Sequence, residues 1–101
     1  MGVQSITLSW VSSWGGVVGR AVVVVRNAAG NPVVGARVFG TWSGLVNGTA
    51  AANTGADGSA TLSSPNVSGQ GTATFTVTGI TLTGSIYDPG LNAETSDSIS
   101  R

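Results

Sequence analysis

A strict alternation of polar and apolar residues runs from residue 72 to residue 78, where threonine occupies every even-numbered position. The side chains of a β-strand point alternately to its two faces, so Ala73, Phe75 and Val77 share one face and the threonines share the other. The pattern therefore predicts a half-buried strand whose apolar face packs on a core.

A second alternation covers residues 33–42, where the even-numbered residues from Val34 to Trp42 share one face. A segment rich in turn residues precedes it at residues 27–32, and a valine-rich run at residues 20–26 comes before that turn. We therefore expect residues 20–26 to be the hairpin partner of residues 33–42.

Short apolar segments separated by turn residues fill the rest of the chain, and no segment is typical of a helix. Ile6, Leu8 and Trp10 share one face of a first strand, which ends at the glycine pair 15–16. The other predicted elements are strands at 49–53 and 59–63 around a turn at 54–58, a loop at 65–71, and a tail at 92–101 that is either a final strand or a linker. The pattern gives an all-β fold of about seven strands.

A G-x-P turn followed by the pattern G-A-x-V stands at residues 30–38, and residues 40–44 read Gly-Thr-Trp-Ser-Gly. In these segments the chain resembles bacterial immunoglobulin-like domains of large extracellular proteins. Residues 56–62, 74–77 and 87–89 resemble later strands of the same family. The resemblance covers about residues 17–99 of a single domain at 1–101. It implies an immunoglobulin-like antiparallel β-sandwich that acts as a spacer, stalk or adhesion module without chemistry of its own.

Three apolar residues, Val22, Val24 and Phe39, depart from this resemblance, because they take positions that a solvated sandwich fills with small or polar residues. Only 8% of the chain is charged, so few charges discourage association through such a surface. We hypothesise that a second copy or a neighbouring domain covers these residues. The alternative is that scattered exposed valines are normal on a monomer.

The chain contains no Cys, His or Lys, which removes the usual general base, thiolate nucleophiles and Schiff-base chemistry. Its acids are Asp57, Asp88, Glu94 and Asp97. A glycosidase needs two of them as a pair, but solvated surface carboxylates explain them more simply. We expect a protein that is not an enzyme and needs no cofactor.

Asp88, Asn92 and Glu94 lie close together in the C-terminal part of the chain, and their oxygens are of the kind that calcium requires. Their spacing matches no EF-hand loop. An acidic, solvated tail without a metal is the favoured interpretation.

Trp14 is a candidate platform for a sugar ring, because it lies in a predicted loop between serines and glycines. Trp10 and Trp42 share faces with apolar residues and are expected in the core. Binding of a carbohydrate or a protein partner, as an accessory module of a secreted hydrolase, is therefore the alternative to a structural role.

Charge and hydropathy exclude two further partners. The net charge is zero and the four arginines are scattered, so we expect no nucleic acid binding. No run of about 18 apolar residues exists, so we expect no membrane insertion. The first residues lack a signal-peptide pattern, so an extracellular or cell-surface location is an expectation that follows from the resemblance.

The alternations also predict which residues form the core between two sheets. These are Ala21, Val23, Val25, Ala36, Val38, Trp42, Phe75 and Val77.

Overall fold

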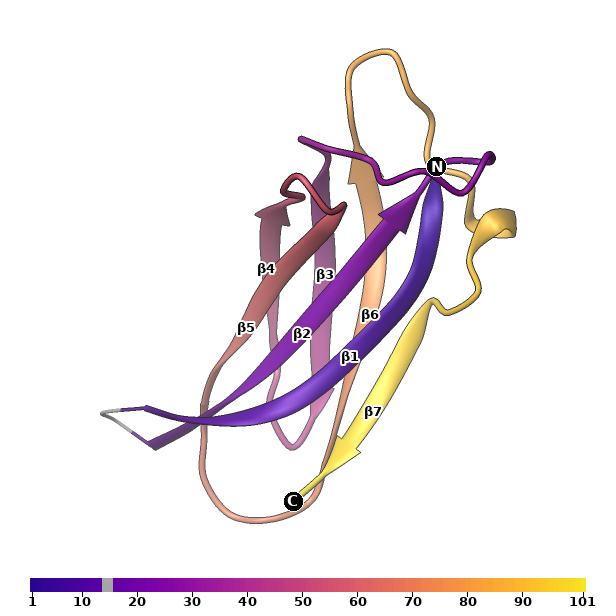
Figure 1. Cartoon of the computed structure of the whole chain (residues 1–101). Helices are drawn as coiled ribbons and strands as arrows, with labels where there is room; N and C mark the ends of the chain where they lie inside the picture. Colours follow the sequence, from indigo (N-terminus) through magenta and orange to yellow (C-terminus); the bar gives the residue numbers. More distant parts are fainter. Residues whose placement is uncertain (14–15) are drawn as a thin grey trace.

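A computed structural model describes residues 1–13 and 16–101, and this part of the chain forms seven β-strands and one short 3-10 turn (Figure 1). The strands are β1 (Gly2–Ser13), β2 (Gly16–Arg26), β3 (Arg37–Gly44), β4 (Gly48–Asn53), β5 (Ser59–Val67), β6 (Thr72–Thr81) and β7 (Ser96–Ser100). The 3-10 turn is η1 (Pro89–Leu91). The prediction of an all-β fold with about seven strands is confirmed.

The strands form two antiparallel sheets that pack face to face. One sheet has the order β1-β2-β5 and the other has the order β4-β3-β6-β7. The Cα trace is elongated, with dimensions of 41 × 24 × 17 Å. Figure 1 shows the N-terminus in the upper part of the molecule, below the tip of the loop that follows β6, and the C-terminus near the lower end.

The predicted hairpin between residues 20–26 and 33–42 is wrong. β2 pairs with β1 and β5, whereas β3 pairs with β4 and β6, so these two strands belong to different sheets. A single bridge between Arg26 and Pro32 is formed near the turn. Both strands carry an apolar face, and the two faces meet across the core because the segment at 27–36 carries the chain from one sheet to the other.

The predicted alternation holds from Ala36 to Trp42 but not at its first residue. Val34 is 57% exposed, and its neighbour Val33 is buried instead, at 8% exposure. Gly35 lies between this segment and the strand with a φ of +77°, a left-handed conformation that glycine adopts without strain. This residue breaks the register, so Val34 does not continue the inward face of β3.

The loop predicted at residues 65–71 begins later, because β5 continues through Val67. β5 is an edge strand of its sheet, and its pairing with β2 shifts register opposite Gly19. Pro65 lies at this bulge, where a residue without an N–H group is tolerated. The C-terminal tail does form a final strand, β7, one of the two predicted alternatives.

The core lies between the two sheets and contains the eight residues predicted from the alternations, each of them buried. Trp10, which was also expected in the core, is only half-buried and packs against its margin. Trp42 and Phe75 are its largest fully buried side chains, with ring centroids 4.9 Å apart and ring planes tilted by 57°. Two inward-facing glycines make room for these rings. Gly40 lies against the Phe75 ring and Gly19 against the Trp42 ring, each close enough that a β-carbon would touch it.

The turn at residues 54–58 carries the chain from β4 in one sheet to β5 in the other. Asp57 Oδ1 accepts hydrogen bonds from the Ser59 hydroxyl at 2.7 Å and from the Ser59 N–H at 3.1 Å. These bonds, the hydroxyl first, lower the pKa of Asp57 below its ordinary value of 3.8.

We expect this turn to lose stability in acid. Because the folded-state pKa of Asp57 is depressed, its contribution is fully present above pH 3.8 and is lost as the pH falls through the lowered value. Urea unfolding of the parent and of Asp57→Asn between pH 2 and pH 7 measures this effect. The stability difference should shrink toward low pH, and a difference that grows there would contradict the assignment.

Candidate functional site

The first strand lies against the C-terminal segment along one side of the sandwich, and we call this contact the seam. It joins residues 1–10 to residues 86–100 through six hydrogen bonds among the described residues. β1 and β7 are the edge strands of different sheets, so the seam closes the sandwich on this side.

Three of the six bonds join backbone groups. The Met1 amino group donates to Ile86 O at 2.9 Å, and Asp88 N–H donates to Met1 O at 2.8 Å. Ala93 N–H donates to Val3 O at 2.9 Å. Gly2 permits this close approach, since a β-carbon there would lie 2.8 Å from the β-carbon of Leu91.

Asn92 extends the seam with its side chain. Its Oδ1 accepts a hydrogen bond of 2.7 Å from Val3 N–H. Its Nδ2 donates to the Tyr87 hydroxyl at 2.6 Å and to Thr95 Oγ1 at 3.0 Å. The amide is therefore held at both ends, and its oxygen takes the place of a backbone carbonyl of a neighbouring strand.

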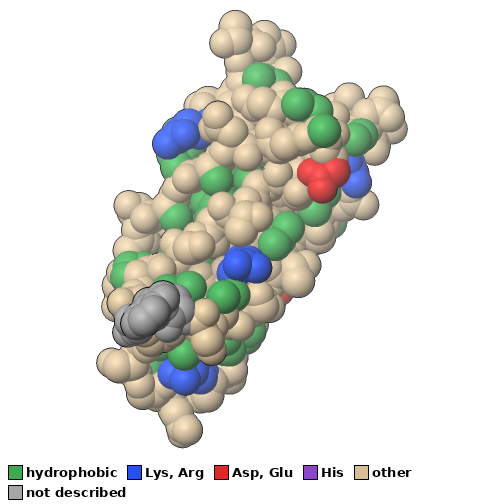
Figure 2. All heavy atoms as spheres, turned by 60° about the vertical axis from the view of Figure 1, so that its left-hand side comes forward, with side chains coloured by type: hydrophobic (Ala, Val, Ile, Leu, Met, Phe, Trp, Pro, Cys, Tyr) green, Lys and Arg blue, Asp and Glu red, His purple; other side chains and the backbone are tan. Residues whose placement is uncertain are grey.

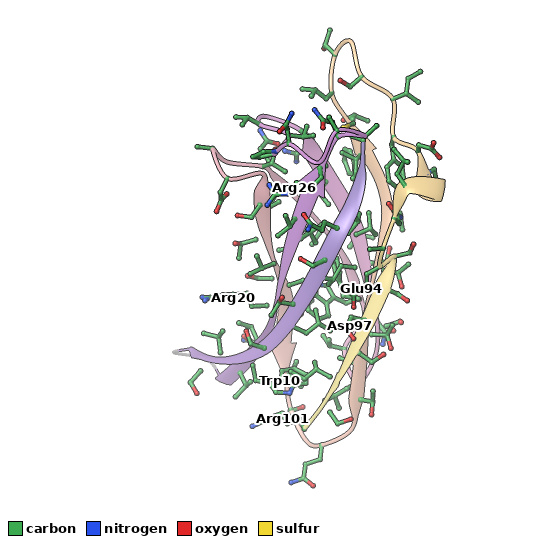
Figure 3. All side chains as sticks on the ribbon, turned by 45° about the vertical axis from the view of Figure 1, so that its right-hand side comes forward. Trp10, Arg20, Arg26, Glu94, Asp97 and Arg101 are labelled. Carbon is green, nitrogen blue, oxygen red and sulfur yellow. The ribbon has the colours of Figure 1, made fainter. Side chains whose placement is uncertain are left out.

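Glu94 and Trp10 complete the seam. Glu94 Oε2 accepts a hydrogen bond of 2.8 Å from Ile6 N–H, and Trp10 Nε1 donates one of 3.1 Å to Ser100 O. Figure 3 shows Glu94 between β1 and β7, with Trp10 nearer the end where Arg101 lies. An edge strand normally leaves backbone N–H groups open to pairing with another chain. In β1 the N–H groups of Val3 and Ile6 instead find acceptors within the seam.

The three residues considered as metal ligands thus have hydrogen-bond partners within the chain. Asn92 and Glu94 accept bonds from β1, while the Asp88 carboxyl accepts a bond of 2.9 Å from Gly90 N–H and caps η1. Within residues 1–13 and 16–101, no three His, Cys, Asp or Glu side chains gather closely enough to hold a metal ion.

We expect Asn92→Ala to destabilise the fold by about 1–3 kcal/mol, because it leaves the part-buried Val3 N–H without its acceptor. Urea unfolding at neutral pH measures this loss. Asn47→Ala is the matched control, since the exposed Asn47 makes one long bond of 3.5 Å to Gly44 O. Equal losses in the two variants would contradict the role of Asn92.

Val22 and Val24 lie on the outer face of the three-stranded sheet, and both are half-buried. The register of β2 places Thr7 and Thr61 on either side of Val22, and serines from β1 and β5 on either side of Val24. The valines are therefore separated from the sheet edges by hydroxyl-bearing side chains. Figure 2 shows a face of the molecule on which hydrophobic side chains form small, scattered areas.

Phe39 lies on the outer face of the other sheet, where its register partners are Ala51 on β4 and Gly79 on β6. The Arg37 guanidinium lies 5.6 Å from the ring centroid, a distance typical of a cation–π contact. A trough of about 270 Å³ runs beside the ring, lined also by threonines from β3, β4 and β6. Because Phe39 and the two valines face opposite sides of the sandwich, one flat interface covers one of these surfaces but not both.

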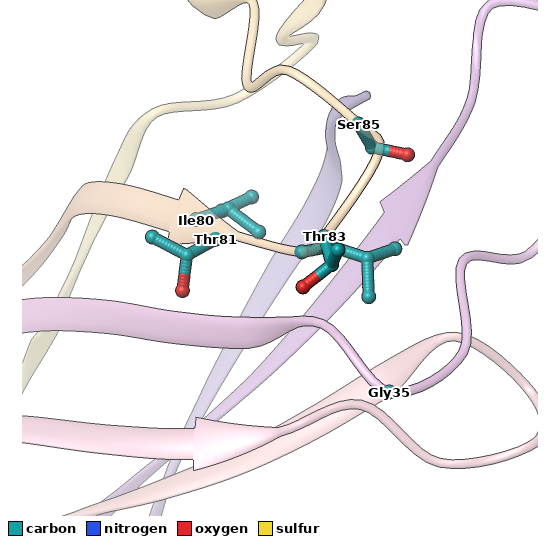
Figure 4. Close-up of a pocket in the computed structure, with 6 residues that line it drawn as sticks. Gly35, Ile80, Thr81, Thr83 and Ser85 are labelled. Carbon is teal, nitrogen blue, oxygen red and sulfur yellow. The ribbon is translucent and has the colours of Figure 1, made fainter.

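A larger hollow of about 460 Å³ opens at the end of β6 (Figure 4). It is lined by Gly35, Ile80, Thr81, Leu82, Thr83 and Ser85. None of these six side chains is charged, so the hollow presents hydroxyls without a titratable group. Trp14, the sugar-binding candidate, lies outside the described residues.

Sequence reasoning selected Asn92 and Glu94 for their oxygens but did not identify their partners, and it missed Tyr87 and Thr95 as the groups that orient Asn92. The β1 partner of Asn92 lies 89 positions earlier in the chain, and that of Glu94 lies 88 positions earlier. No local spacing carries that information.

Comparison of the chain with protein families, with curated proteins and with solved structures gives no match. Among the described residues, no helix has the length and hydropathy needed to cross a membrane.

Proposed function

We propose that this chain is a non-catalytic spacer module of a larger secreted or cell-surface bacterial protein. The observation that carries the proposal is that the two ends of the chain lie in opposite halves of an elongated body 41 Å long (Figure 1). Segments joined to such ends are held apart by much of the length of the domain. The seam supports this role because it fastens both terminal segments to the folded body.

The strand order favours an immunoglobulin-like topology for this module. If the strands are lettered in the immunoglobulin manner, β1-β2-β5 corresponds to A-B-E and β3-β6-β7 to C-F-G. β4 then pairs with the C strand, instead of lying beside E as in constant-type domains. Trp42 on β3 occupies the place of the buried Trp of strand C and packs on Phe75, in a chain that has no disulfide.

The acids support a structural role over a catalytic one. Each accepts a backbone hydrogen bond: Asp57 from Ser59, Asp88 from Gly90, Glu94 from Ile6 and Asp97 from Ser98. Carboxyl groups used in this way fix turns and strand edges. The location at a cell surface or in a secreted protein rests on the resemblance in the sequence.

A distance measurement between the two poles tests the spacer. The chain has no Cys, so Ser85→Cys and Gln70→Cys provide two unique, exposed sites for spin labels. Ser85 lies in the loop after β6 and Gln70 in the loop between β5 and β6, and these loops are at opposite ends of the molecule (Figure 1). We expect one narrow distribution near the long dimension of 41 Å, unchanged when folded domains are fused to both ends. A broad or short distribution in the fusion would contradict the proposal.

Carbohydrate binding is the second candidate, and the trough beside Phe39 favours it. A partly exposed ring, threonine hydroxyls and the Arg37–Asn53 pair, joined by a bond of 3.2 Å, are the groups that bind a neutral sugar. Affinity electrophoresis in gels containing neutral polysaccharides tests this idea. Retardation that Phe39→Ala abolishes would support binding at the trough, and mobility independent of every polysaccharide would contradict it.

A further inference from the structure

The side of the sandwich opposite the seam has two sheet edges, β5 and β4 (Figure 1). The free edge of β5 is closed at both ends. At its start, Ser59 donates its N–H to Asp57 Oδ1 and accepts a bond at its carbonyl from Gly55 N–H. Near its other end, Pro65 has no N–H group and lies where the pairing with β2 shifts register. Such features prevent an edge strand from pairing with another chain.

β4 carries no such protection. Thr54 N–H, just after this strand, donates to Ala36 O at 2.7 Å. Bonded and non-bonded pairs alternate along an antiparallel ladder, so the even-numbered residues of β4 also bond to β3. The odd-numbered residues, Thr49, Ala51 and Asn53, point their N–H and C=O groups away from β3. All three are exposed, and β4 contains no charged residue, no proline and no bulge.

This free edge of β4 is complementary to itself. When two copies of β4 are placed antiparallel about a two-fold axis at Ala51, that residue lies opposite Ala51 of the second copy. Each Thr49 then lies opposite Asn53 of the other copy. These residues all point outward, so each pair can exchange two backbone hydrogen bonds. A methyl group faces a methyl group, a hydroxyl faces an amide, and no charges repel each other across the axis.

We propose that β4 pairs with β4 of a second copy of this chain, so that the two four-stranded sheets become one sheet of eight strands. The pairing also involves Phe39, one of the residues expected at an interface. Phe39 is the register partner of Ala51, so the two Phe39 rings lie in one row with both alanines between them. The trough beside each ring is lined by Thr49, Ala50 and Ala51, so both troughs border the interface.

Sedimentation velocity of the parent chain across a concentration series tests the association. Six residues from each copy make a small interface, of the transient class that buries less than about 1,200 Å². We expect a monomer at about 10 µM and a reversible dimer as the concentration approaches about 1 mM.

Charged variants show whether β4 forms the interface. Ala51→Lys should abolish the dimer, because two ammonium groups then lie directly opposite each other. An equimolar mixture of Ala51→Lys and Ala51→Glu should restore it, because opposite charges then face each other across the axis. Thr61→Lys is the matched control, since it places the same charge at an exposed position of β5 and should leave the dimer unchanged.

Cysteine cross-linking tests the register, in a chain that has no Cys of its own. Residues opposite each other in a bonded antiparallel pair have Cα atoms about 5.5 Å apart, within the range of a disulfide. Ala51→Cys should therefore give a disulfide-linked dimer on mild oxidation. Asn53→Cys is equally exposed and should not, because the two copies of residue 53 lie about 14 Å apart along the paired strands.

A parent chain that stays monomeric at about 1 mM would overturn the proposal. A dimer that survives in Ala51→Lys would also overturn it, and so would equal cross-linking of the two cysteine variants. Association that appears only when a neighbouring domain is fused to the chain would assign the edge to that domain and overturn the pairing of copies. None of these results bears on the spacer, because the distance between the two labelled loops is measured within one copy.

Discussion

Phe75→Ala should lower the free energy of unfolding by about 3–5 kcal/mol, a large part of what a domain of this size possesses. Phe75 is fully buried at 0% exposure, and its ring packs on Trp42 and against Gly40. Removing the ring leaves a cavity between the sheets that the two β-ladders prevent from closing. Urea unfolding monitored by tryptophan fluorescence and by circular dichroism measures the loss.

Phe39→Ala is the matched control for this prediction. This variant also removes a phenyl ring, but Phe39 lies on the outer face of β3 and its ring is partly exposed. We expect a loss below about 1.5 kcal/mol, since less apolar area returns to water and no cavity forms. Comparable losses for Phe39→Ala and Phe75→Ala would show that the assignment of inner and outer faces is wrong.

Gly40→Ala should also be strongly destabilising, by about 3 kcal/mol, at the upper end of the usual cost of overpacking. A β-carbon at this position would overlap three carbons of the Phe75 ring. The ring cannot swing aside because Trp42 packs on it, and β3 cannot move because β4 and β6 hold it on both sides. Denaturant unfolding of the purified variant gives the loss directly.

Gly79→Ala supplies the contrast, since Gly79 is the register partner of the neighbouring residue Phe39 and faces the other way. A β-carbon at Gly79 meets no atom within 4 Å. We expect this variant to be neutral or more stable by about 0.5 kcal/mol, because alanine is less flexible than glycine in the unfolded chain. If both glycine variants lost stability equally, crowding by Phe75 would not be the cause.

The alternations in the sequence predicted which side chains face the core, because the period of a strand is fixed by its geometry. All eight predicted core residues are buried, from Ala21 to Val77. The same alternations did not predict which sheet each strand joins. β2 and β3 are apolar on one face and adjacent in the chain, and that description fits both a hairpin and two strands facing each other across a core.

The site was predictable in its chemistry but not in its geometry. The oxygens of Asn92 and Glu94 are suited to a cation and equally suited to backbone N–H groups. The choice between these partners depends on how β1 passes the C-terminal segment, which is set by the packing of the two sheets. The exposed Val34 has a similar cause, because a single left-handed Gly35 shifted the register.

Amide hydrogen exchange at Val3 and Ile6 shows whether the seam holds β1 to the C-terminal segment. Both amides donate to side chains of the C-terminal segment, at 2.7 Å and 2.8 Å, and would otherwise lie on the open edge of a sheet. If the seam holds the two terminal segments together, they should exchange about as slowly as Val23 in the central strand β2, through global unfolding. Rapid exchange at Val3 and Ile6 while Val23 stays protected would show that β1 has a free edge and that the seam does not hold the terminal segments together.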